Sequence, residues 1–388
     1  MPIVNRFADF QADTVAWRRD FHQHPELMYD VHRTATAVAE KLRSFGVDEV
    51  VTGIGRTGVV GVIRGRASAS GKVIGLRADM DALPLREATG LPYASRSDGR
   101  MHACGHDGHT AMLLGAARYL AETRNFDGTA VVIFQPAEEG GAGGKAMVDD
   151  GLMDRWNIQQ VFGMHNMPGM TPGSFAIRPG ALMASTDDFT IDITGRGGHA
   201  AKPHDTVDPV AVGTALVQAL QTIVSRSVDP VESAVVSVTR FHVGDAHNII
   251  AETARIGGTV RTLKPELRDL VEMRMRRIVE GMALAHDAEI VIDYDRNYPV
   301  TRNHAAETAF AARVAVDVAG AANVDTDTPP VMGGEDFSYM LEARPGAFIF
   351  IGNGDSAGLH NPAYDFNDEI IPAGSSYWAR LVETAMPA

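Results

Sequence analysis

The sequence is poor in cysteine and in positive charge, and it has no long apolar run. A single cysteine among 388 residues excludes an intrachain disulfide, and the first residues, MPIVNRFADF, lack a secretory signal, so the cytoplasm is the expected location. The formal net charge of -14 disfavours nucleic acid and anionic membranes, because both are negatively charged themselves. No apolar run reaches the length that spans a bilayer. We therefore expect a small-molecule substrate, and neither a nucleic-acid nor a membrane partner.

The composition is otherwise that of an ordinary folded protein. Hydrophobic residues make up 45% of the chain and charged residues 22%, which supplies enough apolar material for a substantial core. A chain of 388 residues exceeds the usual size of one hydrophobic core. The length thus predicts two domains, or one large domain that carries an insertion.

Four apolar runs between helical patterns predict the central sheet. Short runs that stay apolar throughout are typical of strands covered by helices on both faces. The sequence therefore predicts an α/β fold with a mostly parallel mixed sheet between helices. The four predicted strands are 71–79, 129–139, 158–166 and 346–354.

Each of these strands ends in, or runs just ahead of, residues that can bind metal or move protons. In open α/β sheets the ligand site lies outside the carboxyl ends of the strands, so residues far apart in the chain can meet there. We expect one site at this edge of the sheet. Its candidates, in chain order, are Asp79, Asp81, Glu138, Glu139, His165 and His360.

The pattern of elements changes in the segment 185–298. The order strand, helix, strand, strand, helix, strand is that of a ferredoxin-like βαββαβ domain. We therefore predict an inserted domain at 185–298 within a discontinuous domain formed by 1–184 and 299–388. The predicted elements of the insertion are strand 188–196, helix 208–226, strands 233–244 and 254–262, helix 264–286 and strand 288–296.

The segment MHACGHDGHT gathers three histidines, an aspartate and the cysteine. Cys104 and His106 are two residues apart, so in an extended loop their side chains point to the same side and can share a metal ion. A helical pattern begins straight afterwards, and Asp107 is a candidate for its cap. Two other interpretations stay open: Cys104 as a papain-like nucleophile with a histidine base, and Cys104 as a packed bystander.

The segment QPAEEGGAGG places Glu138 and Glu139 at a predicted strand end, ahead of flexible glycines. Adjacent side chains in extended backbone point opposite ways, so one carboxylate can hold a metal while the other faces a substrate or a water. The alternative is a pair of solvated glutamates in a loop. His165 and His360 each precede an asparagine in a loop after a strand, and they supply the imidazoles that a dinuclear site requires.

Two further segments belong to the same predicted edge. RADMDALP supplies Asp79 and Asp81, which are candidates for metal ligands, for partners of ligand histidines, or for an ordinary turn. MGGEDFSYM, residues 332–340, has the pattern of a glycine turn at the start of a helix. We predict that this segment supports the site.

The inserted domain contributes three candidates of its own. In GRGGHAAKPH, His199 directly follows two glycines, where the backbone can approach a ligand closely. Asn248 lies between the second and third predicted strands of the insertion, and Arg261 is able to clamp a carboxylate with two hydrogen bonds. Taken alone, each of the three favours a structural role over a functional one.

Taken together, these segments resemble one known family. RADMDALP, MHACGHDGHT, QPAEEG, GMHNMPG, GRGGHAAKPH, MGGEDFSYM and GLHNPAYDFND, in this order over almost the whole chain, are similar to the hippurate hydrolase and auxin-conjugate amidohydrolase branch of the dinuclear-metal aminoacylase and carboxypeptidase superfamily. The resemblance implies metal-dependent hydrolysis of N-acyl amino acids. It also implies that the insertion is a lid domain, through which the chain forms a homodimer or homotetramer.

The resemblance assigns a role to each candidate. Glu138 is implied as the general base, Asp81 as the supporting aspartate of the DALP segment, and His199 as the group that stabilises the oxyanion. Asn248 and Arg261 are implied to hold the carboxylate of the amino acid, and Asp79 stands where the wider superfamily has a metal-binding histidine. The implied ligands of two divalent ions, which would be Mn, Zn, Ni or Co, are Cys104, His106, Glu139, His165 and His360.

Three other functions are alternative hypotheses to an N-acyl amino acid hydrolase. Cys104 would act as the nucleophile of a cysteine-dependent amide hydrolase, which chelators would not inhibit. A metallo-carboxypeptidase or dipeptidase would use the same metal site on small peptides. A binding protein for amino acids on the same fold would bind without turnover.

Overall fold

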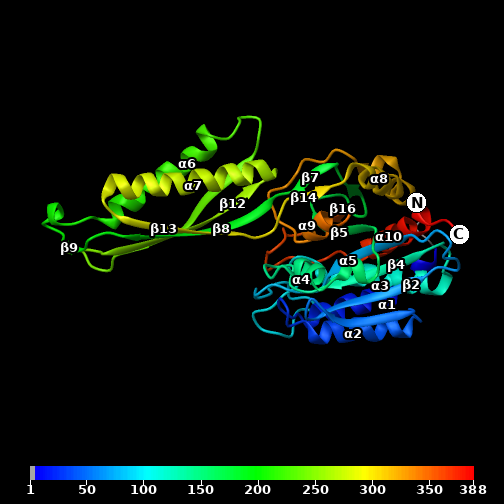
Figure 1. Cartoon of the computed structure of the whole chain (residues 1–388). Coiled ribbons are helices and arrows are strands. Elements are labelled where there is room, and N and C mark those ends of the chain that lie inside the picture. The colour runs from blue at the N-terminus through cyan, green and yellow to red at the C-terminus, as the bar shows by residue number, and fades with distance from the viewer. Residues whose placement is uncertain (1–4) are drawn as a thin grey trace. The chain divides into compact units, whose positions relative to one another are not determined.

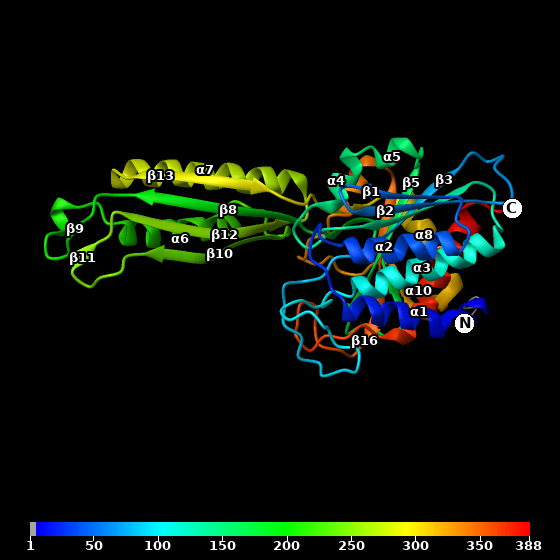
Figure 2. The same ribbon diagram turned by 90° about the horizontal axis from the view of Figure 1, so that it is seen from below.

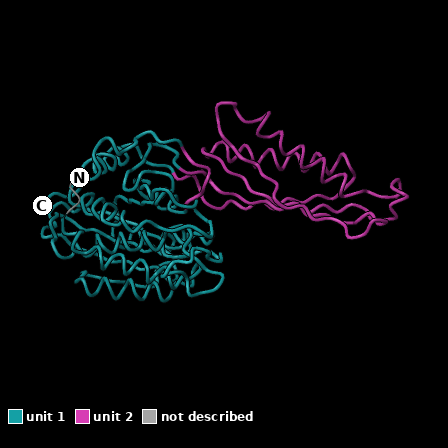
Figure 3. Tube along the Cα trace, turned by 180° about the vertical axis from the view of Figure 1, so that it is seen from behind, with its two compact units in different colours: residues 1–182, 302–329, 336–388 teal, residues 183–301, 330–335 magenta. Residues whose placement is uncertain are grey.

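The computed structural model describes residues 5–388, and the chain divides into two compact units. Figure 1 follows the elements along the chain and Figure 3 colours the two units. Unit 1 comprises the chain up to Leu182 together with Arg302–Pro329 and Asp336–Ala388, and unit 2 comprises Met183–Thr301 and Pro330–Glu335. Among the described residues, no helix is long and apolar enough to cross a membrane.

Unit 1 is built on an eight-stranded mixed sheet in the order β1-β2-β4-β3-β5-β16-β6-β15. Its four central strands, β4, β3, β5 and β16, run parallel to one another. The pairs β1 with β2, β2 with β4 and β6 with β16 are antiparallel. This confirms the predicted α/β fold. The strands are β1 (Glu49–Ile54), β2 (Gly58–Arg64), β3 (Val73–Asp79), β4 (Thr129–Gln135), β5 (Gln160–Pro168), β6 (Phe175–Ala176), β15 (Val324–Asp325) and β16 (Gly346–Gly354).

Helices cover both faces of this sheet. In Figure 2, α4 and α5 lie on one side of β1 and β2, and α1, α2 and α3 lie on the other. Helix α3 is apolar and buried along most of its length, because it packs between the sheet and the helices α1 and α10. The helices of unit 1 are α1 (Arg6–Gln23), α2 (His32–Ser44), α3 (His106–Thr123), α4 (Gly143–Asp149), α5 (Leu152–Arg155), α8 (Ala305–Ala319), α9 (Ser338–Ala343) and α10 (Ile371–Ala385).

Short elements complete unit 1. Strands β7 (Gly180–Met183) and β14 (Thr301–Asn303) pair with each other at the point where the chain passes between the units. Single 3-10 turns occur at Pro203–Asp205 in unit 2, and at Ala321–Asn323 and Asp368–Ile370 in unit 1.

Unit 2 has the βαββαβ order of a ferredoxin-like fold. Its antiparallel sheet has the order β10-β12-β8-β13, and α6 and α7 pack on one face. Unit 2 has its own hydrophobic core under these helices. Alternate residues of β8, namely Phe189, Ile191 and Ile193, are buried in it. The elements are β8 (Ser185–Thr194), α6 (Pro209–Arg226), β10 (Ala234–Val243), β12 (Thr253–Thr262), α7 (Pro265–His286) and β13 (Glu289–Arg296).

A small second sheet lies at one end of unit 2. Strands β9 (Gly198–His199) and β11 (Ile249–Ile250) pair there, and both figures of the ribbon show them beyond the tip of the larger sheet. Helix α6 follows β9 in the chain and begins at Pro209. The Asp208 side chain caps it by accepting a hydrogen bond from the Val210 backbone nitrogen at 2.8 Å, and Pro209 takes the first helical position.

Candidate metal centre

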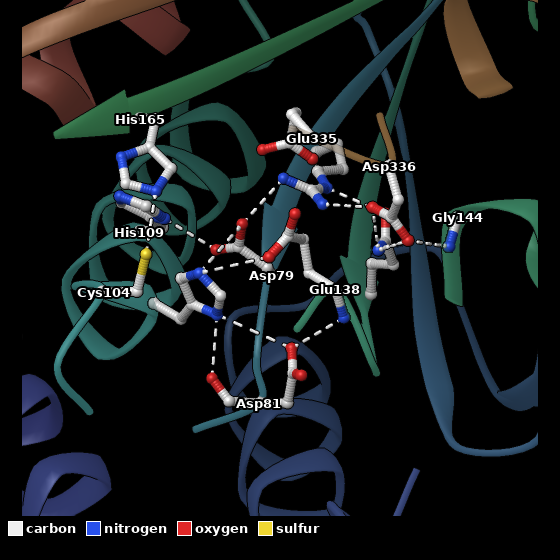
Figure 4. Close-up of polar contacts among 12 residues, drawn as sticks. Asp79, Asp81, Cys104, His109, Glu138, Gly144, His165, Glu335 and Asp336 are labelled. Carbon is white, nitrogen blue, oxygen red and sulfur yellow. Dashed lines mark hydrogen bonds and ion pairs between the residues drawn. The ribbon is translucent and has the colours of Figure 1, made fainter. Parts of the chain in front are cut away.

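The candidate site lies at the carboxyl ends of the central parallel strands. Strand β3 ends at Asp79, β4 ends just ahead of Glu138, and β5 carries His165 near its end. Because these strands are neighbours in the order β4-β3-β5, their ends open at the same edge of the sheet. In Figure 4, His165 and Cys104 lie next to each other, and Asp81 reaches the backbone nitrogen of Glu138.

Cys104 and His106 come together through a helix start rather than through the extended loop that the sequence suggested. Gly105 adopts a positive φ of 93°, and α3 begins at His106. A Cβ atom on Gly105 would lie 2.2 Å from Oδ1 of Asn166, so only glycine fits this turn. The turn leaves Sγ of Cys104 3.3 Å from Nε2 of His165.

His106 presents one ring nitrogen to the site. Its Nδ1 donates a hydrogen bond to the backbone oxygen of Asp81 at 2.8 Å, which fixes the proton on that nitrogen. Its Nε2 is buried and has no hydrogen-bond partner. That atom is therefore free to bind a cation.

Glu138 and Glu139 lie in a turn, and the expectation of an extended pair with opposed side chains was wrong. The Asp81 carboxylate accepts the backbone N–H groups of Glu138 at 3.0 Å and of Glu139 at 3.1 Å. Both glutamate side chains consequently reach the same space, at 4.0 and 3.9 Å from Nε2 of His106. Oε1 of Glu139 also lies 3.5 Å from Nε2 of His360, at the far end of the site.

The donor atoms of this site fit a pair of divalent cations. Two buried ligand atoms, Nε2 of His106 and Oε1 of Glu139, have no hydrogen-bond partner. Thiolate, imidazole and carboxylate together suit Zn, Co, Ni or Mn better than Mg or Ca, which prefer oxygen alone. Three overlapping groups keep their ligand atoms within 4.8 Å of one another: Cys104 with His106 and His165, Cys104 with Glu139 and His360, and His106 with Glu138 and Glu139.

The electrostatics of the site favour positive charge. Burial raises the pKa of the Cys104 thiol well above its usual range, and the nearby carboxylates of Glu139 and Glu138 raise it further. Burial lowers the pKa of His106, but Asp79 and the other carboxylates more than offset this and raise it to about 10. These carboxylates therefore favour positive charge in the cluster, and a divalent ion would neutralise them.

Asp79 lies behind the histidines. Its carboxylate accepts hydrogen bonds from Nδ1 of His109 at 2.6 Å and from Nη1 of Arg77 at 2.7 Å. Nε2 of His109 in turn lies 2.7 Å from Oδ1 of Asn166, beside His165. Asp79 also approaches Nε2 of His106 to 3.6 Å, so it stands beside the candidate ligands with both of its oxygens already engaged.

A buried ion network anchors the start of α3, and sequence reasoning missed it. Asp107 does not cap the helix as suggested; its Oδ2 accepts from Nε of Arg18 and from Nδ1 of His22, both at 2.8 Å. Arg18 is fully buried and also pairs with Asp365 at 2.8 Å and with Asp368 at 3.4 Å. Arg18 and His22 share one face of α1 at i, i+4 spacing, but the sequence does not show that this face is buried.

In unit 2 the structure brings two of the three candidates together. His199 is exposed in β9, and the backbone oxygen of Asn248 accepts from the nitrogen of the neighbouring Ala200 at 3.1 Å. Arg261 lies near the other end of β12, half-buried, where its guanidinium contacts Thr259. Eight residues of strand separate it from the β9 end, which is about 26 Å. Within unit 2, Asn248 and Arg261 therefore do not meet.

A family model and similar known proteins agree on the family of this chain. Residues 75–384 match the family described as peptidase family M20/M25/M40. The chain is similar to a hippurate hydrolase of Campylobacter jejuni, at 45% identity over 381 residues that cover 98% of each chain. It is also similar to N-acetylcysteine deacetylase of Bacillus subtilis, at 38% identity over 373 residues that cover 96% of each chain.

A solved structure agrees with these relatives. A dinuclear metal-binding peptidase of the M20 family from Bacillus subtilis superposes with a TM-score of 0.85 at 35% identity, and the match covers 98% of this chain and 99% of that one.

The buried network around His22 predicts a stability that depends on pH. Burial lowers the pKa of His22, but hydrogen bonds to Asp107 and Glu87 outweigh this and raise it from 6.5 to about 9. The protonated form is thus favoured by folding, with a contribution that is complete below pH 6.5 and lost as the pH rises through 9. The contribution at neutral pH is about 2–3 kcal/mol at most.

We therefore expect His22→Gln to lower the unfolding temperature clearly at pH 7 and only slightly at pH 10. Thermal unfolding of the metal-loaded protein at both pH values measures this. His24→Gln is the matched control, because His24 contacts Asp20 instead of the network. An equal loss at the two pH values would show that His22 is not protonated in the folded protein.

Proposed function

This chain belongs to peptidase family M20/M25/M40 and is an amide hydrolase of that family, and we propose that it splits N-acyl amino acids into a carboxylic acid and a free amino acid. The observation that carries the proposal is the convergence of ligand atoms around Nε2 of His106 and Oε1 of Glu139, two buried atoms without a hydrogen-bond partner. The names of the relatives support the substrate class, since hippurate and N-acetylcysteine are both N-acyl amino acids.

Five residues would hold two divalent cations in this site. The ions would be Mn, Zn, Ni or Co, as the mixed donor set suggests. When bound, such ions polarise the substrate carbonyl and lower the pKa of water. The proposed ligands are Cys104, His106, Glu139, His165 and His360.

Glu138 is the proposed general base. Its side chain lies in the same space as the proposed ligands, and its backbone is fixed by the Asp81 carboxylate. In this role the Glu138 carboxylate takes a proton from the attacking water and then delivers it to the nitrogen of the departing amine, which is a poor leaving group without a proton. Asp81 supports the reaction from behind, because it holds the turn that carries both glutamates.

The structure argues against Cys104 as a nucleophile. A reactive cysteine is a thiolate at an accessible, electropositive position. Cys104 is 7% exposed, and burial together with the carboxylates of Glu139 and Glu138 raises its pKa. A buried thiol with a raised pKa is a poor nucleophile, so we assign Cys104 the role of a metal ligand instead.

Unit 2 is proposed as a lid that joins two copies of the chain. Its strand β13 is a sheet edge with a partner on one side only. Among the described residues, seven of the eight large hydrophobic side chains that are exposed belong to this unit, and contact with a second copy would cover such side chains. The seven are Val210, Val224, Val231, Ile249, Met273, Leu284 and Val291.

The spacing within unit 2 supports a contribution from a second copy. His199 and Asn248 lie at the β9 end, about 26 Å along the sheet from Arg261, so one copy cannot place all three around one small substrate. We propose that Arg261 of one copy binds the substrate carboxylate, while His199 and Asn248 reach that substrate from the other copy. His199 would then stabilise the oxyanion.

Metal dependence separates the proposal from the cysteine hypothesis. We expect the chelated protein to release no amino acid from hippurate or N-acetyl amino acids, and addition of Mn, Co, Ni or Zn to restore release. The measurement is amine release across N-acyl amino acids and, for comparison, dipeptides. If the chelated protein keeps full activity and iodoacetamide abolishes it, Cys104 is the nucleophile. If amine release is faster from dipeptides than from N-acyl amino acids, the enzyme is a peptidase.

Replacement of the proposed base should separate binding from turnover. Glu138→Gln keeps the size of the side chain but cannot accept a proton, so kcat should fall by at least about 100-fold. The content of metal, measured by mass spectrometry of the purified protein, should not change. Glu40→Gln, on an exposed position of α2, is the control. Activity of Glu138→Gln near that of this control would remove Glu138 from the role of base.

Mixed oligomers test the contribution of the second copy. His199→Ala and Glu138→Gln should each be nearly inactive on their own. When they are expressed together, a mixed dimer contains one site with an intact Glu138 and an intact His199 from the other copy, so about a quarter of the wild-type activity should return. No recovery in mixed dimers isolated with two affinity tags would mean that His199 acts within its own chain or not at all.

A further inference from the structure

Backbone strain collects around the loop that carries Glu138. Non-glycine residues with positive φ are uncommon, and they cost free energy unless the surrounding structure compensates. Four of them occur here: Met28 at 53°, Arg56 at 78°, Ala137 at 55° and Ala142 at 54°. They come from three segments far apart in the chain, which indicates that contacts between these segments hold the loop in place.

An N-terminal segment supplies those contacts. The backbone oxygen of Met28 accepts from the nitrogen of Ala137 at 3.1 Å, ahead of the two glutamates. The hydroxyl of Tyr29 donates to the backbone oxygen of Gly141 at 2.6 Å, behind them. A Cβ atom on Gly141 would lie 3.1 Å from Cε2 of the Tyr29 ring, so the ring packs directly on the glycine. The segment thus holds the turn with Glu138 on both sides.

Tyr29 is itself fixed by a third segment. The guanidinium of Arg56 lies 4.1 Å from the centre of the Tyr29 ring, in the arrangement of a cation–π contact. The hydroxyl of Thr57 donates to the backbone oxygen of Tyr29 at 2.9 Å. The ring and the backbone of Tyr29 are therefore both held before its hydroxyl meets the loop.

The loop needs such an attachment because glycines leave its backbone with many accessible conformations. At its start, the Asp81 carboxylate holds the nitrogens of Glu138 and Glu139. At its end, the nitrogen of Gly144 donates to Asp336 at 2.7 Å. Tyr29 holds the stretch between these two points, where glycine follows glycine.

We propose that Tyr29, backed by Arg56, is a positioning residue that keeps Glu138 in place for proton transfer. The inference rests on the proposed function for the role of Glu138, whereas the attachment of the loop by Tyr29 stands apart from it. A base that is displaced by a fraction of an ångström transfers protons far less efficiently, although the substrate still binds. The role should therefore appear in kcat rather than in KM.

The test compares Tyr29→Phe with Tyr119→Phe in the metal-loaded protein. Tyr119 is a half-buried tyrosine that also loses one hydrogen bond, to Glu383, far along α3 from the ligands. We expect Tyr29→Phe to lower kcat about tenfold, with KM and metal content unchanged, because one hydrogen bond to the loop is lost. Arg56→Lys keeps the cation over the ring and should retain most activity, whereas Arg56→Ala should behave as Tyr29→Phe does.

Two further measurements separate positioning from general damage. In a Glu138→Gln background, Tyr29→Phe should cause no further loss of kcat, since there is no base left to position. Hydrogen exchange of the backbone amides at 137–144 should become faster in Tyr29→Phe and stay unchanged in Tyr119→Phe. An unchanged kcat, an additive loss in the double variant, or unchanged exchange would each overturn the inference.

The exchange measurement also keeps the two proposals distinguishable. If the wild-type protein hydrolyses no N-acyl amino acid, the proposed function fails. Faster exchange at 137–144 in Tyr29→Phe would then still show that Tyr29 holds the loop, and its role toward Glu138 as a base would fail with the function.

Discussion

Negative charge buried at the carboxyl ends of β3 and β4 is the constraint on which the rest of this structure depends. Carboxylates out of contact with water are costly unless hydrogen bonds or cations compensate them. The fold compensates Asp79 with Arg77 and His109, and Asp81 with backbone N–H groups. Oε1 of Glu139 has no hydrogen-bond partner, and neither does Nε2 of His106, which lies 3.9 Å from it. A cation between them satisfies both, which is why we interpret the arrangement as a metal site.

Distant parts of the chain hold this charge in position. The N-terminal helix supplies Arg18 and His22, which anchor Asp107 beside the candidate ligand His106. The same arginine pairs with Asp365 and Asp368, so α1 and a segment close to the C-terminal helix meet at the start of α3. A third support is the contact of Tyr29 with the glutamate loop. The proposed ligands thus stand on elements that are cross-linked by buried polar contacts, an arrangement that holds a site in place.

Most of the fold could be predicted from the sequence, because periodicity and apolar runs report local structure directly. The four central strands and the six main elements of unit 2 lie where these patterns place them, whereas the short strands β9 and β11 were not predicted. The prediction failed where backbone geometry departs from regular structure: Gly105 turns the chain into a helix before His106, and Glu138 lies in a turn. It was silent on the pairing of Arg18 with Asp107, 89 residues away, since nothing local marks a buried partner. The separation of Asn248 and Arg261 could not be predicted either, because it depends on how the strands of unit 2 pair.

The most direct test of the account is to locate the metal itself. Crystals of the protein loaded with Mn or Zn, measured with X-rays at the absorption edge of that metal, show each ion as a peak in the anomalous difference map. We predict two peaks, both within bonding distance of the cluster formed by Cys104, His106, Glu139, His165 and His360, with a sulfur ligand at about 2.3 Å from zinc. Peaks elsewhere, or an empty cluster in a protein that hydrolyses its substrate, would contradict the account.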